Sequence, residues 1–351
     1  MNKQALAVFS TDLHLKTQNI DQIIDLVTQQ CELAKSTGAK YLICLGDVFD
    51  SRIAQREDIL TAFGKILDII KSYDLKMWLI PGNHDKTDYV SSNSFLSPFS
   101  THPCLTLVHL SGSIPFLDSK IRLGFIPFFK EEVWLQQFEE YCDYLGLEDL
   151  DPEIKIILCT HIAVTGSQNN DGKPASSILS TKLFKPFFKV FSGHYHDQQK
   201  IGSNFYHLPS IQQNNFGENT DKGFTILYSD GSHELVKSKF REYHKVEIDL
   251  DNITGSELNV LRQQYSEVKD NIRFEFKGSE KVLKSLRKED FTSLGIDVKT
   301  KVKEIESDIE YADSTEVIEH TKESIREEFE KFCKQESLNW EEGLKFLNKI
   351  L

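Results

Sequence analysis

The chain has 351 residues, of which 39% are hydrophobic and 27% are charged, and its formal net charge is −13 at pH 7. At about 100 to 200 residues per domain, this length predicts two or three folding units. No apolar run approaches the roughly 18 residues that span a bilayer, and the first predicted strand begins too early to leave room for a signal peptide. We therefore expect a cytosolic protein without a membrane segment. The six cysteines form no C-x-x-C pair, and we expect free thiols.

Residues 1–230 alternate between strand-like and helix-like patterns. Apolar runs predict strands at residues 5–10, 41–45 and 76–80, and helical spacing predicts a helix from Ile20 to a C-cap at Gly38 and a second one over about residues 53–73. Later strands are expected at residues 121–126, 155–159, 189–192, 205–208 and 223–228. Residues 165–177, which contain Gly, Asn and Pro, are expected to form a loop. Strands that alternate with helices predict an α/β sheet.

Charge divides the chain into three parts. Residues 1–235 carry a net charge of −8, residues 236–303 carry +3, and residues 304–351 carry −8. The middle part is predicted to be a small α+β module. The last part contains two amphipathic helical patterns, formed by Val317, Thr321, Ile325, Phe329 and Phe332 and by Trp340, Leu344, Leu347 and Leu351. These helices could fold back onto their own chain or dock on a partner helix pair, and the sequence alone favours neither.

Five short segments place a potential metal ligand directly after an apolar run. They are Asp12-Leu13-His14, Gly46-Asp47-Val48-Phe49-Asp50, Gly82-Asn83-His84-Asp85, Thr160-His161 and Gly193-His194-Tyr195-His196. In an open α/β sheet, ligands bind outside the carboxyl ends of the strands, so side chains that are distant in sequence can meet in one crevice. The segments together supply enough ligands for two metal ions.

A hydrolase with two metal ions needs one anionic ligand that touches both ions and an open edge for water and substrate. Asp47 is the natural bridge. Asp12, His14 and one histidine of the Gly-His-x-His segment would complete one ion. Asn83, His161 and the other histidine of that segment would complete the second. Carboxylate, amide and imidazole donors together suit Mn, Fe or Zn better than Ca or Mg.

His84 is the one histidine in these segments that is not counted as a ligand. An imidazolium at the edge of the metal site could protonate a departing alkoxide, and a neighbouring carboxylate would orient it and keep it charged. Asp50 is the candidate for that carboxylate. Four basic residues are candidates for phosphate contacts, with solvated surface as an equal alternative: Arg52, Arg56, Lys173 and Lys182.

With this ordered set of motifs the chain resembles the calcineurin-like metallophosphoesterase superfamily and, within it, the Mre11/SbcD-type DNA nuclease subunits, especially the phage type. The motifs D-x-H, G-D-x-F-D-x-R, G-N-H-D, T-H and G-H-x-H lie within residues 5–230. The resemblance implies a four-layer α/β sandwich of two mixed β-sheets flanked by helices. It also implies three domains: a metallophosphoesterase (nuclease) domain over residues 1–235, a capping and DNA-contact domain over residues 236–303, and an acidic linker with a partner-binding helical tail over residues 304–351.

The resemblance also implies a role for each site residue. By the family pattern, Asp12, His14, Asp47 and His196 hold the first ion, Asp47, Asn83, His161 and His194 hold the second, and His84 is the acid. Archaeal and eukaryotic members carry histidine where this chain has Asp50. The two ions are expected to be Mn, with Fe or Zn as alternatives.

The activity implied by the resemblance is that of a 3′ to 5′ DNA exonuclease and structure-sensitive endonuclease in DNA repair and recombination. The implied partner is a Rad50/SbcC-type ATPase, which would bind the C-terminal helices in the cytosol of a bacterium or a phage-infected host. The resemblance also allows a homodimer.

The net charge argues against a nucleic acid substrate, because phosphate contacts usually require a basic face. Two divalent ions would offset much of the acidic site, and the middle module is net positive. A phosphoesterase acting on a phosphoprotein, a cyclic nucleotide or a nucleotide-lipid diester is the alternative enzyme. A metal-free scaffold is disfavoured because no expected ligand is missing.

Overall fold

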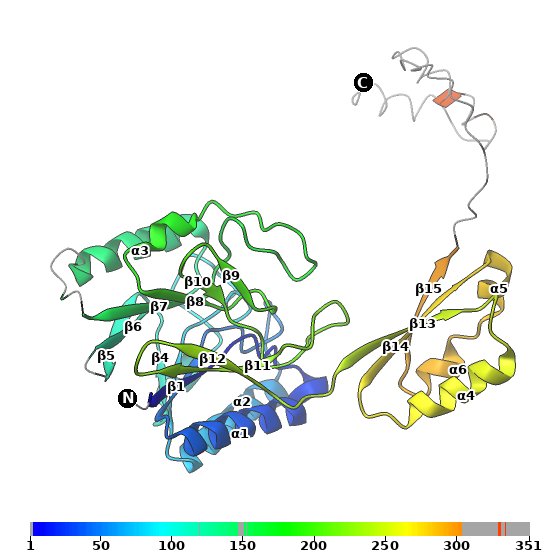
Figure 1. Ribbon diagram of the computed structural model, residues 1–351, viewed down its shortest axis with the longest axis horizontal. Coiled ribbons are helices and arrows are strands. Elements are labelled where there is room, and N and C mark those ends of the chain that lie inside the picture. Colours follow the sequence, from blue (N-terminus) through cyan, green and yellow to red (C-terminus); the bar gives the residue numbers. More distant parts are fainter. Residues whose placement is uncertain are drawn as a thin grey trace. The chain divides into compact units, whose positions relative to one another are not determined.

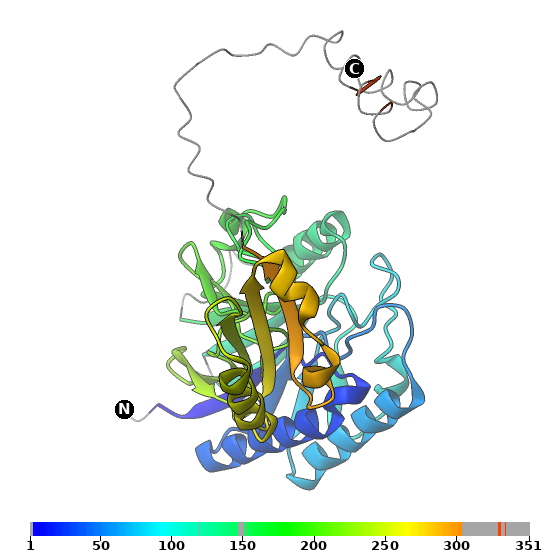
Figure 2. The ribbon, with the colours of Figure 1, turned by 90° about the vertical axis from the view of Figure 1, so that its right-hand side faces the viewer.

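The computed structural model describes residues 3–118, 120–146, 151, 153–303, 329, 330 and 334. The chain divides into two compact units, residues 1–303 and residues 304–351. The first unit contains three β-sheets (Figures 1 and 2). The two predicted tail helices fall almost entirely outside the described residues, so they stay a prediction.

The first sheet is mixed and has six strands in the order β12-β11-β1-β2-β3-β4. β1 to β4 run parallel, and β11 pairs antiparallel with both β1 and β12. The strands are β1 (Ala5–Ser10), β2 (Tyr41–Cys44), β3 (Lys76–Leu79), β4 (Leu105–Leu107), β11 (Gly223–Tyr228) and β12 (His233–Lys237). The crossovers from β1 to β2 and from β2 to β3 contain α1 (Ile20–Thr37) and α2 (Glu57–Ser72), and the 3-10 helix η1 (Thr17–Asn19) precedes α1.

The second sheet is also mixed, with the order β5-β6-β7-β8-β10-β9. Its four central strands are parallel, and β5 and β9 close its edges in antiparallel pairs. The strands are β5 (Gly112–Asp118), β6 (Ile121–Ile126), β7 (Lys155–Thr160), β8 (Lys189–Ser192), β9 (Gln199–Ile201) and β10 (Phe205–His207). One helix, α3 (Glu131–Leu145), joins β6 to β7, and two 3-10 helices, η2 (Ser97–Phe99) and η3 (Thr181–Phe184), lie in loops.

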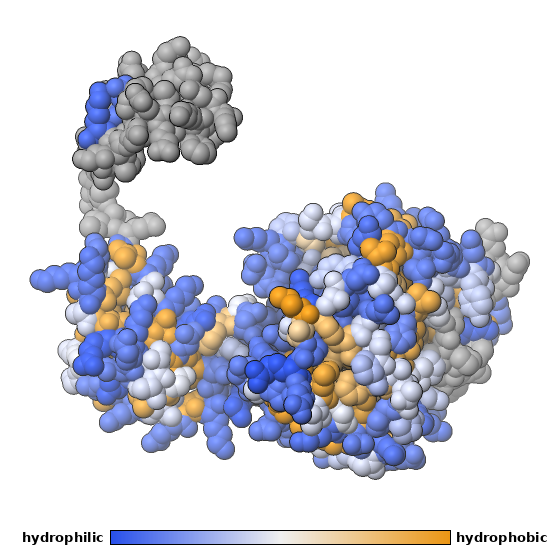
Figure 3. All heavy atoms as spheres, turned by 180° about the vertical axis from the view of Figure 1, so that it is seen from behind, coloured by the Kyte–Doolittle hydropathy of each residue, from blue (hydrophilic) through white to orange (hydrophobic). Residues whose placement is uncertain are grey.

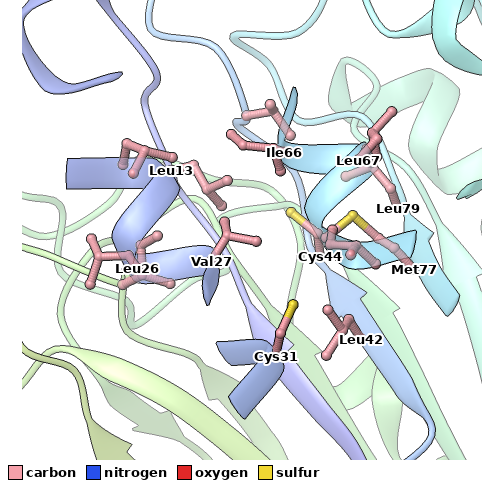
Figure 4. Close-up of a cluster of buried hydrophobic side chains, with 14 of the residues drawn as sticks. Leu13, Leu26, Val27, Cys31, Leu42, Cys44, Ile66, Leu67, Met77 and Leu79 are labelled. Carbon is pink, nitrogen blue, oxygen red and sulfur yellow. The ribbon is translucent and has the colours of Figure 1, made fainter. Parts of the chain in front are cut away.

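Hydrophobic cores fill the three spaces between four layers. The first core packs α1 and α2 against the first sheet, and Figure 4 shows Leu26 and Ile66 of the helices in one cluster with Leu42 and Met77 of the strands. The second core lies between the two sheets, and the third packs α3 on the outer face of the second sheet. Strand residues alternate between neighbouring cores, as the period of two in a β-strand requires. In β2, for example, Leu42 and Cys44 belong to the first core and Ile43 belongs to the second.

Residues 243–303 form a small α+β module with its own core. Its sheet is fully parallel, in the order β13-β14-β15, with β13 (Tyr243–Asp249), β14 (Asn271–Gly278) and β15 (Asp297–Val302). The helices are α4 (Gly255–Ser266), α5 (Glu280–Ser285) and α6 (Glu289–Thr292). Phe274, Phe276 and Phe291 are buried in its core. On β14 these buried positions alternate with Arg273 and Lys277, so the other face of the sheet is charged.

The predicted α/β class with two mixed sheets and flanking helices is confirmed. α1 ends as expected, because Gly38 adopts a left-handed C-cap with φ of 77°. The second helix begins at Glu57 rather than near residue 53, and Arg56 is its extended N-cap residue. The sequence patterns did not identify α3, β4, β5, β9 or β12.

Among the described residues, no helix combines the length and apolar character needed to cross a bilayer. Hydrophilic and hydrophobic side chains are interspersed on the face shown in Figure 3. The five cysteines in the described part of the chain are all free thiols, as expected.

Candidate metal centre

The predicted ligands meet at the carboxyl ends of five strands. β1, β2 and β3 of the first sheet lead into the segments that carry Asp12, Asp47 and Asn83, and β7 and β8 of the second sheet lead into His161 and His194. Both sheets therefore contribute to one site. The structure brings all seven expected ligands together, and six of them are almost completely buried: Asp12, His14, Asp47, Asn83, His161 and His196.

The first group of donors consists of Asp12, His14 and His196, whose ligand atoms all lie within 4.8 Å of one another. The Nε2 atoms of His14 and His196 are only 3.0 Å apart. Asp12 Oδ1 lies 3.9 Å from the first of these nitrogens and 3.8 Å from the second. Two imidazole nitrogens that face each other beside a carboxylate are arranged as ligands of one shared cation.

The second group consists of Asp47, His161 and His194, again with ligand atoms within 4.8 Å of one another. His161 Nε2 lies 3.2 Å from Asp47 Oδ2. Asn83 Oδ1 completes this group, at 2.9 Å from His194 Nδ1 and 3.2 Å from His161 Nε2. Asp47 Oδ2 is also 4.0 Å from His14 Nε2 in the first group, so Asp47 lies between the groups, where a bridging ligand belongs.

The donor atoms fit two divalent ions. Each group combines carboxylate oxygen with imidazole nitrogen. The ring nitrogen of His161 that faces away from the group, Nδ1, donates a hydrogen bond to the main-chain oxygen of Leu45 at 2.6 Å. Such a contact fixes the ring so that the remaining nitrogen faces the metal. Seven convergent polar side chains, six of them buried, have no role in a hydrophobic core, so we assign them to a dimetal centre.

The charges at the second group are mutually dependent. Burial opposes ionisation of Asp47, but His161, His14 and His84 lower the pKa of its carboxyl below the usual range. Burial would likewise lower the pKa of His161, but Asp47 raises it to about 9. Burial and the proximity of His161 lower the pKa of His194 far below its usual value. A negative charge at Asp47 is therefore strongly favoured by this site.

Four of the candidate ligands have unusual backbone conformations. Asp12, His14, Asp47 and His194 have φ angles of 53°, 46°, 53° and 84°. Left-handed backbone is unfavourable for residues other than glycine and clusters at functional sites. The neighbouring Gly82 is required for a different reason, because a Cβ atom there would overlap the Asp47 carboxylate.

The structure corrects the predicted role of the Asp50 carboxylate. His84 does contact Asp50, but its Nδ1 donates to the main-chain oxygen at 2.6 Å. The carboxylate Oδ1 instead lies 3.5 Å from His14 Nδ1, and this contact with His14 lowers the Asp50 pKa. Asp50 therefore orients His84 through its backbone and a metal ligand through its side chain. Sequence spacing could not distinguish these two atoms.

His84 lies at the edge of the metal centre, with its second ring nitrogen toward the cleft. Its main-chain N–H donates to Asp47 Oδ1 at 2.8 Å, and Arg52 Nη2 lies 2.6 Å from His84 Nε2. Burial lowers the pKa of His84, although the charge of Asp47 opposes this effect. An arginine and a histidine thus stand together beside the predicted ions.

The four basic candidates occupy different places. Arg52 lines the cleft of about 480 Å³ over the metal centre, together with Lys16 and three residues of the predicted loop, Asn169, Asn170 and Asp171. Arg56 is exposed and pairs with Asp58 at 3.0 Å, away from the lining of this cleft. Lys173 and Lys182 do not belong to its lining either.

Sequence reasoning missed the group that supports His196. Glu218 is 6% exposed and accepts a hydrogen bond from His196 Nδ1 at 2.7 Å. Burial alone would raise the pKa of Glu218, but His196 and Lys222 lower it to about 2. Lys222 is fully buried and lies 3.0 Å from Glu218 and 2.7 Å from Asp197. These residues follow no predicted strand end, so no sequence signal marked them.

The loop that carries Glu218 also contacts the small module. Gln213 accepts a hydrogen bond from the main-chain N–H of Tyr243 at 2.9 Å. The ring of Phe216 meets the ring of Tyr243 at 4.8 Å, and the Arg273 guanidinium lies 3.9 Å from the Phe216 ring centre. The same loop therefore supports His196 and contacts β13 and β14.

Comparisons with known proteins found several distant likenesses. "Putative phosphoesterase 244L" of Invertebrate iridescent virus 6 is 22% identical over 292 residues, which are 80% of this chain and 96% of the viral protein. A dimetal phosphatase from Danio rerio is 12% identical with a TM-score of 0.45, over 65% of this chain and 93% of the other. The calcineurin-like phosphoesterase YfkN from Bacillus subtilis is 12% identical with a TM-score of 0.39, over 67% and 89% of the two chains.

These likenesses are distant, and the family model gives the stronger result. The model described as calcineurin-like phosphoesterase matches residues 7–198, which is more than half of the chain and includes all seven expected ligands. The chain belongs to the calcineurin-like phosphoesterase family.

Proposed function

We propose that this phosphoesterase is a DNA nuclease of the Mre11/SbcD type, which hydrolyses phosphodiester bonds as a 3′ to 5′ exonuclease and structure-sensitive endonuclease in DNA repair and recombination. The observation that carries the proposal is that the cleft over the donor groups adjoins a second cavity. Asn169, Asn170 and Asn215 line the cleft, and Arg52 lines both spaces. A phosphodiester has two ester substituents and needs room on both sides of the phosphorus.

The residues present would hold two ions, with Asp47 shared between them. Asp12, His14 and His196 would complete one ion, as described above, and Asn83, His161 and His194 would complete the other. Bound divalent ions supply an activated water and electrostatic stabilisation of the phosphoryl oxygens. We propose Mn as the metal, because mixed nitrogen and oxygen donors suit it, although they also suit Fe and Zn.

The chain's own groups would orient the phosphate and move a proton. The Arg52 guanidinium, with donors in a fixed fork, is suited to bind a non-bridging phosphate oxygen. His84 Nε2 faces the cleft, because the Asp50 carbonyl fixes the other nitrogen. We assign His84 as the acid that delivers a proton to the departing oxygen once Arg52 has turned to the phosphate, because Nε2 accepts from Arg52 in this structure and must be released and protonated before it can donate. Asp50 would hold both His84 and His14 in place.

DNA as the polymer is supported by the motif resemblance and by the net positive charge of residues 236–303. On the open face of the module sheet, Lys277 pairs with Glu247 and Arg273 pairs with Asp297. Lys245, Lys299 and Lys301 belong to the same face, as do Asp249 and Glu275, so five cations stand against four acids on this sheet. A Rad50/SbcC-type ATPase as partner of the tail is proposed on the resemblance alone, as is a homodimer.

The experiment is incubation with Mn of end-labelled duplex DNA and, in parallel, of bis(p-nitrophenyl) phosphate and a phosphopeptide. Progressive loss of nucleotides from the 3′ end is expected. Hydrolysis of the small diester or the phosphopeptide without any cleavage of DNA would instead favour a phosphoesterase with a non-DNA substrate. His84→Gln tests the acid, and His102→Gln, at a largely buried histidine that pairs with Asp68 outside the cleft lining, is the control.

A further inference from the structure

A second cavity of about 240 Å³ opens beside the metal cleft. It shares four lining residues with that cleft, so the two spaces are continuous: Arg52, Asn83, His194 and Tyr195. Its remaining walls are largely aromatic and apolar, with Tyr89 and Phe128 as the principal rings. A group bound in this cavity would therefore be a direct neighbour of a phosphate on the metal centre.

The two principal rings form a platform next to a metal ligand. Phe128 stacks on His194, with ring centres 6.3 Å apart and planes at 22°. Tyr89 meets Phe128 edge to face, at 5.1 Å and 86°. Neither ring is fully buried, whereas Phe129, the next residue along the chain, is 2% exposed. Aromatic surface of this kind is unusual in a site built for charged ligands alone.

Buried contacts hold the platform in place. Lys86 is fully buried, donates to the main-chain oxygen of Phe128 at 2.9 Å, and lies 3.8 Å from the ring centre of Phe129. The Phe128 N–H donates to the Pro81 carbonyl at 3.0 Å, and the Lys130 N–H donates to the Tyr89 carbonyl at 2.9 Å. The rings are thus preorganised, so a bound planar group loses little affinity to ordering of the protein.

We propose that this cavity is a nucleobase subsite, in which the base next to the scissile phosphate stacks on the ring of Tyr89 and meets the perpendicular ring of Phe128 with its edge. The inference rests on the proposed function and deepens it. A nucleobase offers the flat face that such rings bind, and stacking on one aromatic side chain changes affinity by roughly 5- to 150-fold. Glu131, at the wall of the cavity, supplies a carboxylate acceptor for an N–H on the edge of the base.

The subsite also restricts the substrate. A cavity of about 240 Å³ takes a single base and not a base pair. A base inside duplex DNA is paired and stacked, and it must leave the helix before it can enter a pocket. The reacting nucleotide would accordingly be unpaired, at a frayed end, a gap or a single strand.

The test compares two diesters with the same leaving group in the presence of Mn. Thymidine 5′-(p-nitrophenyl phosphate) carries a base, and methyl p-nitrophenyl phosphate does not. We expect a KM about 10-fold lower for the nucleoside ester, within the range given for stacking. Tyr89→Leu should reduce this preference to about twofold or less, and Tyr89→Phe should retain it. Tyr144→Leu, at a residue that is 76% exposed, is the matched control and should keep the wild-type preference.

A binding measurement separates failure of this inference from failure of the proposed function. Calorimetry with thymidine 5′-monophosphate and with inorganic phosphate should show tighter binding of the nucleotide, and Tyr89→Leu should remove the difference. Hydrolysis of both esters with equal KM, or a preference that Tyr89→Leu leaves intact, would overturn the subsite while the phosphodiesterase function stands. Hydrolysis of neither ester would overturn the proposed function, and the calorimetry would still decide whether the base is bound.

Discussion

Replacement of Glu218 by glutamine tests how the fold holds His196 in position. The Glu218 carboxylate receives a hydrogen bond from His196 Nδ1 at 2.7 Å and an ion pair from Lys222 at 3.0 Å. It also accepts from the main-chain N–H of Asn214 at 3.1 Å and from the Asn215 amide at 2.7 Å. Glutamine keeps the volume of the side chain but removes its charge, so packing is preserved while Lys222 loses a counter-ion.

The expected loss of stability follows from the burial of this pair. Removal of one partner of a buried ion pair costs about 3 to 5 kcal/mol. Lys222 keeps Asp197 at 2.7 Å and the His196 carbonyl at 2.6 Å, so its charge is not left without partners. We therefore expect the cost to lie near the lower end of this range, at about 3 kcal/mol. The loss of the carboxylate behind His196 should also weaken metal binding about 10- to 100-fold.

Urea unfolding in EDTA measures the first effect without any contribution from bound metal, and calorimetric titration with Mn measures the second. Glu234→Gln is the matched control, because Glu234 lies on an exposed strand of the first sheet. The double variant with Lys222→Met should recover much of the stability, since it removes the buried charge. A change in unfolding free energy below about 0.5 kcal/mol, the usual effect of a surface substitution, together with unchanged Mn titration would refute the supporting role of Glu218.

Four further outcomes are expected. His84→Gln should retain both ions, measured by metal analysis, yet lose diester cleavage, and loss of metal would contradict its assignment as acid. Asp47→Ala should lose both ions together, and full retention of one would show that Asp47 is not the bridge. Burial, followed by the charge of Lys189, lowers the pKa of His233 to about 4. The unfolded side chain binds protons more tightly, so this residue makes stability fall as the pH drops from about 6.5 to 4. His233→Gln should flatten this dependence in thermal unfolding, by about 1 to 2 kcal/mol after allowance for solvent screening, and equal slopes would contradict it. Deletion of residues 315–351 should abolish co-purification with the proposed Rad50/SbcC-type ATPase and leave Mn-dependent cleavage intact, whereas loss of folding would favour a tail that folds back.

Much of the layered fold could be predicted because its central strands are buried on both faces. Such strands are continuous apolar runs, as at residues 155–160, and all six residues of β1 are buried. Edge strands are short and mixed in character, so β4 and β9, with three residues each, gave no signal. α3 has only three fully buried residues, Trp134, Phe138 and Tyr141, and its many acidic residues obscured the helical pattern.

The positions of the ligands could be predicted for a related reason. Each follows a buried strand directly, and the ends of parallel strands coincide in space. The supporting residues obey no such rule, because Glu218 reaches His196 from a loop that follows β10. Whether the carbonyl or the carboxylate of Asp50 contacts His84 also depends on the direction of the backbone at Asp50. Sequence spacing carries no information about that direction.

The left-handed backbone at the ligands affects how the site should be probed by mutation. Asparagine adopts this conformation more readily than alanine does, and glycine adopts it freely. An alanine variant of Asp12 or Asp47 would therefore combine loss of a ligand with a backbone penalty of order 1 kcal/mol. Asparagine variants of these two residues separate the two effects, since they remove the charge while the local chain conformation is kept. Alanine scanning alone would overstate how much of the native stability depends on the metal ligands.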